Sequence, residues 1–393
     1  AISIREEFSY GKLYQQDPFL TRFTAQVVSC AADKGGWSVV LDRTAFYPEG
    51  GGQPWDTGTL NGIPVTQVQE QDGAVVHTCA ARLEPGTQVE GAVDWARRFD
   101  LMQQHSGEHI VSGLIHSTYG YDNVGFHLGS DLVTIDFNGP LEEEDLRDIE
   151  LRANQYIWED RPVSVTYPTT KELAALDYRS KKAISGQVRI VSFPGADTCA
   201  CCGTHVASAG QVGLVKLLSV QKFREGVRVE LLCGGRALSY LDRVLGQNRR
   251  ISNLLSAKPF ETAGGVERLL GENQDLKTRL ARMEEARFAQ LADGLAGAGD
   301  VILFEEGLSP DGLRRLCDAV LQVCGGRCAC FSGGDGEGYK YAIGLRGGDL
   351  RSFVRELNQA LDGRGGGRPD FVQGSVRAGR TAIEEFLSAE KQR

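Results

Sequence analysis

The pattern of apolar and polar residues changes three times along the chain, and the first segment is typical of β-structure. Short apolar or alternating runs at 23–28, 37–41, 57–65 and 74–78 are separated by turn residues, which predicts strands. Asn61 and Gly62 form a pair that favours a two-residue hairpin turn. Several short strands at this spacing indicate a small barrel or sandwich over residues 1–92.

From residue 93 the spacing of apolar residues lengthens to every three or four positions in places, which predicts helices among strands. We expect helices over 97–117 and 142–159. Strands are expected over 128–137, 163–167, 188–193, 213–220 and 227–233. A segment that mixes helices and sheet in this way predicts an α+β domain over 93–235.

The third segment, 236–292, carries apolar residues in steps of three and four surrounded by Glu and Arg, which predicts a helical hairpin or short coiled coil. Pro259 would disrupt one continuous helix and therefore marks the break between two arms. The apolar positions are Leu238, Leu241 and Leu245 before the break, and Leu269, Leu276, Leu280 and Met283 after it.

The last segment, 293–393, alternates between strand and helix patterns and predicts a small α/β domain. We expect strands at 301–304, 328–332 and 339–346, helices at 310–323 and 349–361, then a glycine-rich turn and a helix from Thr381. The predicted fold class is therefore a multidomain α+β protein.

Composition and charge narrow the possible functions. The chain of 393 residues has a formal net charge of −9, which argues against a protein that coats nucleic acid with an excess of Lys and Arg but leaves room for a local basic patch. No apolar run is as long as the ~18 residues of a membrane span, and charges near the start argue against a secretory signal. The 10 cysteines are clustered, so we expect reduced thiols or metal ligands in a cytoplasmic protein.

The strongest chemical signal is a pair of histidines, His105 and His109, in a segment predicted to be helical. Residues four apart lie on one helix face, so both rings can reach one ion. Cys201 and His205 repeat this spacing beside Gly203, which allows a tight turn. One thiolate and three imidazoles make a donor set of the kind that binds zinc, in a closed structural site or in a catalytic site with one open position.

Three further residues are candidates for catalysis. Glu108 lies between the paired histidines, where it suits a general base or a partner of a ligand, or a plain solvated carboxylate. His127 is a polar residue on an otherwise apolar strand, and the alternative is a hydrogen-bonded histidine in the core. Gln53 ends the segment Phe46–Gln53, whose three successive glycines favour a close backbone approach, or a simple loop.

Two groups of basic residues and one group of cysteines are also notable. Exposed amides and arginines suit phosphate contacts, and we expect them near the C-terminus at Arg364, Gly365, Gly366, Gly367, Arg368, Arg377 and Arg380. A second basic patch, or a solvated face, is expected at Arg179, Lys181, Lys182 and Arg189. Another cluster, favoured as buried thiols over a second metal site, comprises Cys324, Cys328 and Cys330.

Three of these motifs together resemble one family. The two pairs, His105 with His109 and Cys201 with His205, look like the zinc motif of the alanyl-tRNA synthetase editing domain. Phe46–Gln53 resembles the FYPEGGGQ segment of the adjoining barrel, and Gly365–Asp370 resembles the GGGRPD signature of the DHHA1 domain. Their order matches along nearly the whole chain, and the chain begins at the barrel. It thus resembles the freestanding editing proteins of the long AlaX type.

The resemblance implies an activity and a set of partners. It implies hydrolysis of mischarged tRNA(Ala), chiefly Ser-tRNA(Ala) and also Gly-tRNA(Ala), by a protein that contacts the acceptor end and the elbow of the tRNA. It implies one zinc ion per chain at His105, His109, Cys201 and His205, and a homodimer formed through the C-terminal part. Two residues depart from the family pattern: Cys202 stands where the synthetase often has Gly, and Glu108 where the bacterial enzyme often has Thr.

Two other classes of function fit the same residues. One is a noncatalytic, zinc-stabilised RNA-binding protein, and the other is a metallohydrolase of small esters or amides. An editing site has a physical purpose, because a pocket shaped for alanine rejects the larger serine only weakly, by about 10–200-fold. In such a site zinc activates water, stabilises the oxyanion or binds the substrate amine, and the sequence does not select among these roles.

Overall fold

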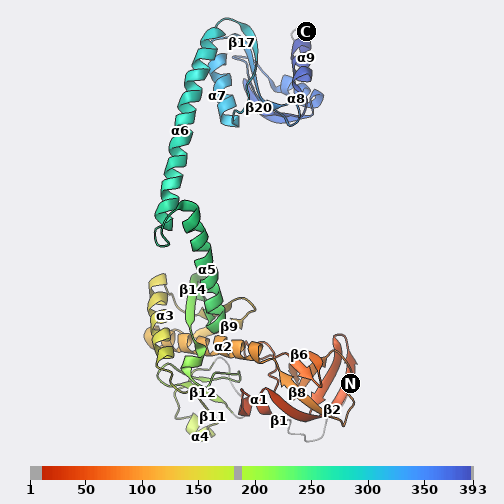
Figure 1. The fold of residues 1–393 in the computed structure, drawn as a ribbon, viewed down its shortest axis with the longest axis vertical. Coiled ribbons are helices and arrows are strands. Elements are labelled where there is room, and N and C mark those ends of the chain that lie inside the picture. The colour runs from red at the N-terminus through yellow and green to blue at the C-terminus, as the bar shows by residue number, and fades with distance from the viewer. Residues whose placement is uncertain (1–10, 181–187, 391–393) are drawn as a thin grey trace. The chain divides into compact units, whose positions relative to one another are not determined.

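The computed structural model describes residues 11–180 and 188–390, and these form several sheets and helices (Figure 1). The chain divides into two compact units, with the boundary between Gln247 and Asn248. Both units contain helices and sheet, as expected of a multidomain α+β protein. None of the described helices is both long and apolar enough to cross a membrane.

Six strands near the N-terminus pair in a closed ring. Their order is β2 (Arg22–Asp33), β3 (Gly36–Leu41), β7 (Ala74–Cys79), β6 (Ile63–Gln71), β5 (Gly58–Leu60) and β8 (Gln88–Val93). The interior is filled by alternate apolar side chains such as Val27 and Val68. Asn61 and Gly62 both have positive φ, 49° and 79°, and join β5 to β6 in the predicted two-residue turn. Outside the ring, β1 (Gly11–Lys12) pairs with β4 (Arg43–Thr44), and α1 (Leu13–Gln16) follows β1.

The rest of the first unit is built around a long helix, α2 (Trp95–Tyr119). Asp94 caps its N-terminus by accepting a hydrogen bond from the Arg97 amide, and Gly120 ends it with a φ of 74°. A four-stranded sheet has the order β14 (Val215–Phe223), β15 (Gly226–Cys233), β10 (Val133–Phe137), β9 (Asn123–Leu128). A smaller sheet comprises β11 (Ser164–Thr166), β12 (Ile190–Phe193) and β13 (Asp197–Ala200), and the other helices are α3 (Glu143–Trp158), α4 (Thr170–Leu173) and η1 (Ala209–Val212).

One predicted strand in this region is wrong. The segment 128–137 is not continuous, because β9 ends at Leu128 and β10 begins at Val133. The two strands are antiparallel neighbours, and the Gly129 amide donates to the Leu132 carbonyl across the turn between them. Gly129 and the polar residues that follow it therefore close a hairpin.

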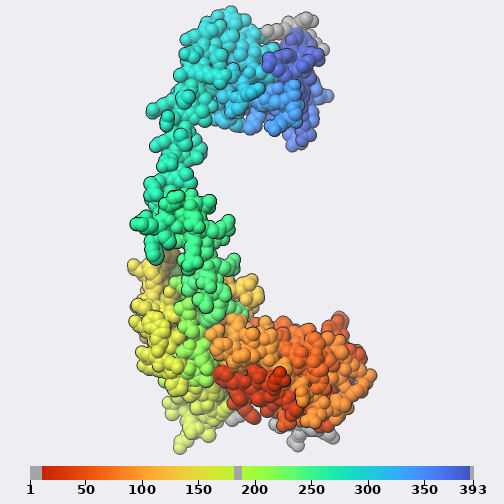
Figure 2. Space-filling view, in the orientation of Figure 1, coloured from red at the N-terminus to blue at the C-terminus, as the bar shows by residue number. Residues whose placement is uncertain are grey.

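Helix α5 (Gly234–Leu255) ends just before the predicted break, and α6 (Thr262–Gly294) begins after Pro259. The predicted apolar positions of α6 are not covered by any described part of the chain. Leu269, Leu276, Leu280 and Met283 are 54–70% exposed, and side chains stand out along this helix in the space-filling view (Figure 2). The stripe therefore remains an unburied apolar face.

The second unit ends in a five-stranded sheet. Its order is β16 (Gly299–Phe304), β17 (Gly325–Gly334), β18 (Gly338–Gly344), β20 (Phe371–Val376) and β19 (Gly363–Arg368). Helices α7 (Pro310–Leu321), α8 (Arg351–Ala360) and α9 (Arg380–Glu390) accompany it. The predicted glycine-rich turn is wrong, because these glycines form the edge strand β19. A side chain at Gly365 would collide with the Tyr341 hydroxyl and the Gln373 carbonyl, so glycine permits this close pairing.

A buried ion pair joins α2 to the barrel region. The Arg98 side chain is 0% exposed, and its Nε donates to Asp56 Oδ1 at 3.0 Å. Its other nitrogens donate to the carbonyls of Pro18 and Ala45, while Asp56 also accepts from the Tyr47 amide at 2.6 Å. Every polar group of this arginine thus has a partner that belongs to the chain before α2.

We predict that Arg98→Met destabilises the first unit by about 3–5 kcal/mol, because it leaves the Asp56 carboxylate buried without its counter-charge. Urea unfolding followed by circular dichroism measures this change. The double variant Arg98→Met/Asp56→Asn serves as the control, since it removes the unpaired charge and keeps an acceptor for the Tyr47 amide. A single variant as stable as the wild type would show that the pair does not hold α2 in place.

Candidate metal centre

Four side chains from two distant segments meet inside the first unit. His105 and His109 lie one turn apart on α2, and Cys201 and His205 follow β13. Their ligand atoms all lie within 4.8 Å of one another. The His105 and His205 rings are 4.6 Å apart between centroids, and Cys201 Sγ lies 3.4 Å from His105 Nε2. The structure therefore brings together all four residues that were singled out as metal ligands.

The chemistry of these four residues fits a zinc ion. Among the described residues, no hydrogen-bond partner faces His109 Nε2 or either ring nitrogen of His205, although all three atoms are buried. Burying such nitrogens without a partner is costly, and a bound ion would remove that cost for His109 Nε2 and for one of the two His205 nitrogens. Three imidazole nitrogens and one thiolate are ligands that zinc accepts in tetrahedral sites.

The protonation of two of these side chains also suits ligation. Burial raises the pKa of the Cys201 thiol, but the neighbouring His105 and His205 lower it well below its ordinary value. Burial lowers the pKa of His205 to about 3, so this ring is neutral near pH 7. A thiolate and a neutral imidazole are the forms that bind metal.

Each histidine of α2 is held from behind by an oxygen. His105 Nδ1 donates to Gln53 Oε1 at 2.8 Å, and His109 Nδ1 donates to Asp197 Oδ2 at 2.7 Å. These bonds leave Nε2 of both rings turned toward the cluster, as in metal sites whose ligands are oriented by a second layer of residues. Gln53 also bonds Thr204 through its Nε2 at 2.8 Å. Gln53 is thus fully buried behind a ligand rather than open to a substrate.

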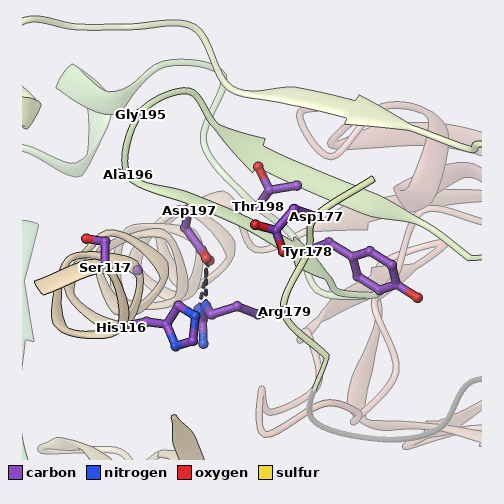
Figure 3. A pocket seen from close by; sticks show the side chains of 10 residues that line it. His116, Ser117, Asp177, Tyr178, Arg179, Gly195, Ala196, Asp197 and Thr198 are labelled. Atoms are coloured by element: carbon purple, nitrogen blue, oxygen red, sulfur yellow. Dashed lines mark hydrogen bonds and ion pairs between the residues drawn. The ribbon is translucent and has the colours of Figure 1, made fainter. Parts of the chain in front are cut away.

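Asp197 is itself held by an arginine that sequence reasoning placed on the surface. Arg179 Nε and Nη2 donate to the two Asp197 oxygens at 2.7 and 2.8 Å. Burial raises the pKa of Asp197, but the hydrogen bonds from His109 and Arg179 lower it below its ordinary value. Arg179 and Asp197 also border a pocket of about 230 Å³, which His116 and Tyr178 line as well (Figure 3).

The expected basic patch is therefore wrong for two of its four members. Arg179 serves Asp197, and Arg189 Nη1 donates to the carbonyls of Cys201 and Gly203 at 2.8 and 3.0 Å. Arg189 thus fixes the turn that carries the ligands. Lys181 and Lys182 lie outside the described residues.

Glycines allow the segments around the cluster to approach one another. A side chain at Gly203 would collide with the His105 ring, and one at Gly52 would collide with Phe126. Gly52 has a φ of 85° and accepts a hydrogen bond from the Leu128 amide at 3.2 Å. The three-glycine segment was expected to approach another part of the chain closely, and that part is β9.

The other two catalytic candidates differ in their surroundings. Glu108 is fully buried, and its Oε1 accepts from Ser112 Oγ at 2.7 Å and from Asn123 Nδ2, so a plain solvated carboxylate is ruled out. Burial lowers the pKa of His109, but the charge of Glu108 and the hydrogen bond to Asp197 raise it well above its ordinary value. His127 is exposed on β9, so it is not a core histidine. Its neighbour Phe126 stacks on His105 at 5.1 Å, and alternate strand residues face opposite ways, so His127 faces away from the cluster.

Comparison with known proteins agrees with this arrangement. Residues 5–97 match the class II (A) tRNA synthetases, residues 188–229 the second additional domain of threonyl and alanyl tRNA synthetases, and residues 298–393 the DHHA1 domain. The alanyl-tRNA editing protein AlaX-L of Pyrococcus horikoshii is 30% identical over 93% of this chain and 95% of its own length. The chain belongs to the alanyl-tRNA editing protein family.

Other relatives share the same span. The alanyl-tRNA editing protein Aarsd1-A of Xenopus laevis is 30% identical over 95% of this chain and 96% of its own. The alanine–tRNA ligase of Pyrococcus abyssi is 31% identical over 95% of this chain but only 43% of the ligase. The chain thus matches AlaX-L and Aarsd1-A over nearly their whole length, but the ligase over less than half of its length.

The residues expected to bind tRNA lie in the second unit. Arg364, the three glycines after it and Arg368 form most of β19, which is an edge strand with exposed side chains. Arg377 pairs with Asp362 at 3.6 Å, and Arg380 pairs with Glu384 at 2.8 Å. Arg368 lies 3.7 Å from Asp370. The structure therefore places Arg364 and Arg368 on one exposed strand and puts an acid beside three of the four arginines.

We predict that the full chain binds one zinc ion and that Cys201→Ala loses most of it, because the only sulfur of the donor set is removed. Asp197→Asn should weaken zinc binding about 10–100-fold and Arg179→Met about tenfold, since both loosen His109. Competition with a chromophoric chelator measures the affinities.

Arg236→Met is the matched control, because Arg236 holds Asp100 by a similar two-pronged contact, and Asp100 in turn accepts from Gln104. Full zinc content in Cys201→Ala would refute this ligand set. Equal affinities in Asp197→Asn and Arg236→Met would remove Asp197 and Arg179 from the metal site.

Proposed function

We propose that this chain deacylates mischarged tRNA(Ala) in trans, chiefly Ser-tRNA(Ala) and also Gly-tRNA(Ala), with one zinc ion. In this proposal residues 1–92 and 93–235 supply the hydrolytic site. Residues 236–292 join it to a C-terminal domain over 293–393 that binds the tRNA. The proposal also places the protein in the cytoplasm, where it meets the acceptor end and the elbow of tRNA(Ala).

One observation carries this proposal. In a chain of the alanyl-tRNA editing family, four zinc-type ligands from distant segments converge, and two of them present buried nitrogens that have no other partner among the described residues. If these four side chains only filled space in the core, their buried nitrogens would be expected to form hydrogen bonds with carbonyls or hydroxyls, as most buried polar groups do. Zinc bound there would supply a Lewis acid, an activated water or a contact for the substrate amine.

The chain's own residues prepare the site in three ways. Gln53 and Asp197 hold two ligand rings in the orientation that binding needs. Burial keeps water away from the histidines, which strengthens electrostatic interactions with a developing charge. Glu108, next to His109 and fully buried, is placed to hold a proton or to tune that ligand.

Discrimination between serine and alanine requires a polar contact. A site built to bond a hydroxyl strongly rejects the analogue without it, because the site's polar groups are then left unpaired. Gln53 is not suited to this contact, since its amide is already bonded to His105 and Thr204. Cys202, which is exposed beside the ligand Cys201, is a better candidate for a residue that contacts the aminoacyl group of the substrate.

We predict that the chain cleaves Ser-tRNA(Ala) much faster than Ala-tRNA(Ala). Glu108→Gln should lower the rate about 10²–10⁴-fold if the carboxylate transfers a proton, while zinc content stays at the wild-type level. Gln keeps an oxygen for Ser112 and Asn123, so this variant removes the charge and spares the hydrogen bonds. Single-turnover deacylation at matched zinc content measures both effects.

An unrelated charged tRNA and a small seryl ester complete this comparison. Equal rates on Ser-tRNA(Ala) and Ala-tRNA(Ala) would contradict serine selectivity. Cleavage of the small ester with no preference for tRNA would favour a general metallohydrolase, and tight tRNA binding without any cleavage would favour a noncatalytic binding protein.

The edge strand β19 supports a role in holding tRNA. Its glycines carry no side chains that would keep a phosphate from the backbone amides, and Arg364 and Arg368 add positive charge on the same strand. Arginines and backbone amides are common partners of nucleic-acid phosphates. Such contacts hold the RNA without reading its sequence.

We predict that Arg364→Ala/Arg368→Ala weakens binding of uncharged tRNA(Ala) about tenfold and lowers the slope of log affinity against log salt by about 2, since two phosphate contacts are lost. Zinc content and cleavage of a small seryl ester should be unchanged. Arg351→Ala is the control, because Arg351 is an exposed arginine beside an acid, as Arg368 is, but lies on α8 rather than on β19. An effect of the control as large as that of the double variant would refute a specific role of β19.

The apolar stripe of α6 supports the expected homodimer. Leu269, Leu276, Leu280 and Met283 recur at intervals of seven, four and three, which is the spacing of a coiled-coil seam. Their exposure on a helix suits burial against the same stripe of a second copy.

We predict that Leu276→Glu/Leu280→Glu converts a dimer into a monomer in sedimentation experiments, because two charges at the seam cannot be buried. Thr278→Glu is the comparison variant, because Thr278 is exposed and lies two residues from both Leu276 and Leu280, on the opposite face of the helix. A wild-type chain that sediments as a monomer at micromolar concentration would contradict the proposed dimer.

A further inference from the structure

A second convergence of metal-binding side chains lies in the other unit, apart from the candidate editing site. Cys317 is on α7, and Cys328 and Cys330 are two residues apart on β17, so they face the same side of the strand. The three sulfurs all lie within 4.8 Å of one another, and Cys328 Sγ is 3.6 Å from Cys330 Sγ. The sequence cluster of Cys324, Cys328 and Cys330 is thus rearranged by the fold.

Cys324 serves as an internal contrast. It is as buried as the other three, and its sulfur bonds the Gly326 carbonyl of its own turn at 3.5 Å. Cys317 likewise bonds a carbonyl, that of Cys328, at 3.5 Å, but its sulfur also lies within 4.8 Å of the Cys328 and Cys330 sulfurs, and that of Cys324 does not belong to this group. Three thiols therefore point at one region, while a fourth thiol from the same segment packs as an ordinary small side chain.

The surroundings of the three thiols are apolar. All three are 0% exposed and belong to a core with Phe288, Val301, Leu316 and Phe371. A packing role alone needs only small apolar groups, of the kind that Ala342 supplies in the same core. What packing does not require is that the three sulfurs, the most polarisable atoms present, be neighbours of one another.

The spacing of the sulfurs matches that around a single ion. Three sulfurs bonded to one ion at about 2.3 Å stand about 4 Å apart, which falls between the 3.6 Å from Cys328 Sγ to Cys330 Sγ and the 4.8 Å upper bound for all three. Donor sets of thiolates select soft ions such as copper(I) and zinc. Structural zinc takes four ligands, and within residues 11–180 and 188–390 no fourth His, Cys, Asp or Glu joins this group.

We propose that Cys317, Cys328 and Cys330 form a site for copper(I), an ion that needs only two or three sulfur ligands. On binding, two of the thiols each release a proton to solvent and form sulfur–copper bonds, while the third sulfur completes the site as a neutral thiol. The bound group then carries a single negative charge, which limits the cost of burying it. No electron transfer is involved, because copper enters and stays as copper(I).

The test uses the full chain, reduced and without oxygen, with its zinc content fixed beforehand. Copper is supplied during expression and, in parallel, by titration of copper(I) against bicinchoninate. We expect one copper(I) per chain that resists the chelator, with only sulfur neighbours in X-ray absorption spectra. We also expect the thermal unfolding temperature of the second unit to rise on loading.

Single alanine and valine substitutions identify the ligands. Cys317→Ala, Cys328→Ala and Cys330→Ala should lose the retained copper, and the valine series decides wherever an alanine variant fails to fold. Cys324→Ala is the matched control and should keep it, as should Cys201→Ala, which separates this site from the editing site. Three results would overturn the proposal. The variants of Cys317, Cys328 and Cys330 would keep as much copper as Cys324→Ala, the site would hold zinc instead of copper, or the chain would bind no copper by either route. None of these results bears on deacylation.

Discussion

The candidate metal centre depends on how closely helix α2 approaches the elements around it. A side chain at Gly107 would collide with the Cys233 sulfur, and one at Gly113 would collide with the Ala196 carbonyl. At the other end of the helix, Arg98 reaches Asp56 and two carbonyls of the preceding region. A helix fixed at three points along its length cannot shift by even a fraction of a turn without a clash or a broken ion pair. Its two histidines are therefore presented to the Cys201 segment in one arrangement.

Polar partners are distributed unequally around this cluster. The Nδ1 atoms of His105 and His109 are bonded by oxygens that arrive from other segments, and one of those oxygens belongs to a carboxylate clamped by Arg179. On the inner side His109 Nε2 and the His205 nitrogens have no such partner in the described part of the chain. Each buried nitrogen without a partner costs about 1–3 kcal/mol. An ion at the centre would take up His109 Nε2 and one nitrogen of His205.

Sequence reasoning found the residues whose signal is local and missed those whose role depends on distant partners. The four ligands were visible because each pair is four residues apart, and the helices around 97–117 and 142–159 followed from apolar spacing. Asp197 is 88 residues from His109 and looks like any turn acid, so only the fold reveals its hydrogen bond. Arg179 was taken for surface charge, because composition does not show that a carboxylate lies within its reach.

The same limit explains the errors in the second unit. Glycines at 365–367 signal a turn by propensity, but pairing with β20 makes them a strand. A larger residue is excluded at Gly365 by Tyr341 and Gln373 and at Gly367 by the Phe371 carbonyl, whereas Gly366 has open space around it. Cys317 was not grouped with Cys328 because the contact joins a helix to a strand. The α6 leucines were correctly placed on a helix, but apolar spacing does not say which surface covers them.

The proposed function places hydrolysis in the first compact unit and tRNA binding in the second, and this division has a physical consequence. A net charge of −9 opposes tight binding of a polyanion, so neither a small acyl pocket nor a single glycine-rich strand is expected to hold tRNA strongly by itself. When two weak sites on one chain contact the same molecule, the second contact becomes intramolecular and acts at an effective concentration in the millimolar range. If β19 holds tRNA as proposed, modest affinity there would raise the occupancy of the proposed hydrolytic site without extra contacts to the amino acid. The proposed selectivity for serine could then reside entirely in the first unit, while the second unit would contribute affinity that is the same for correct and incorrect tRNA.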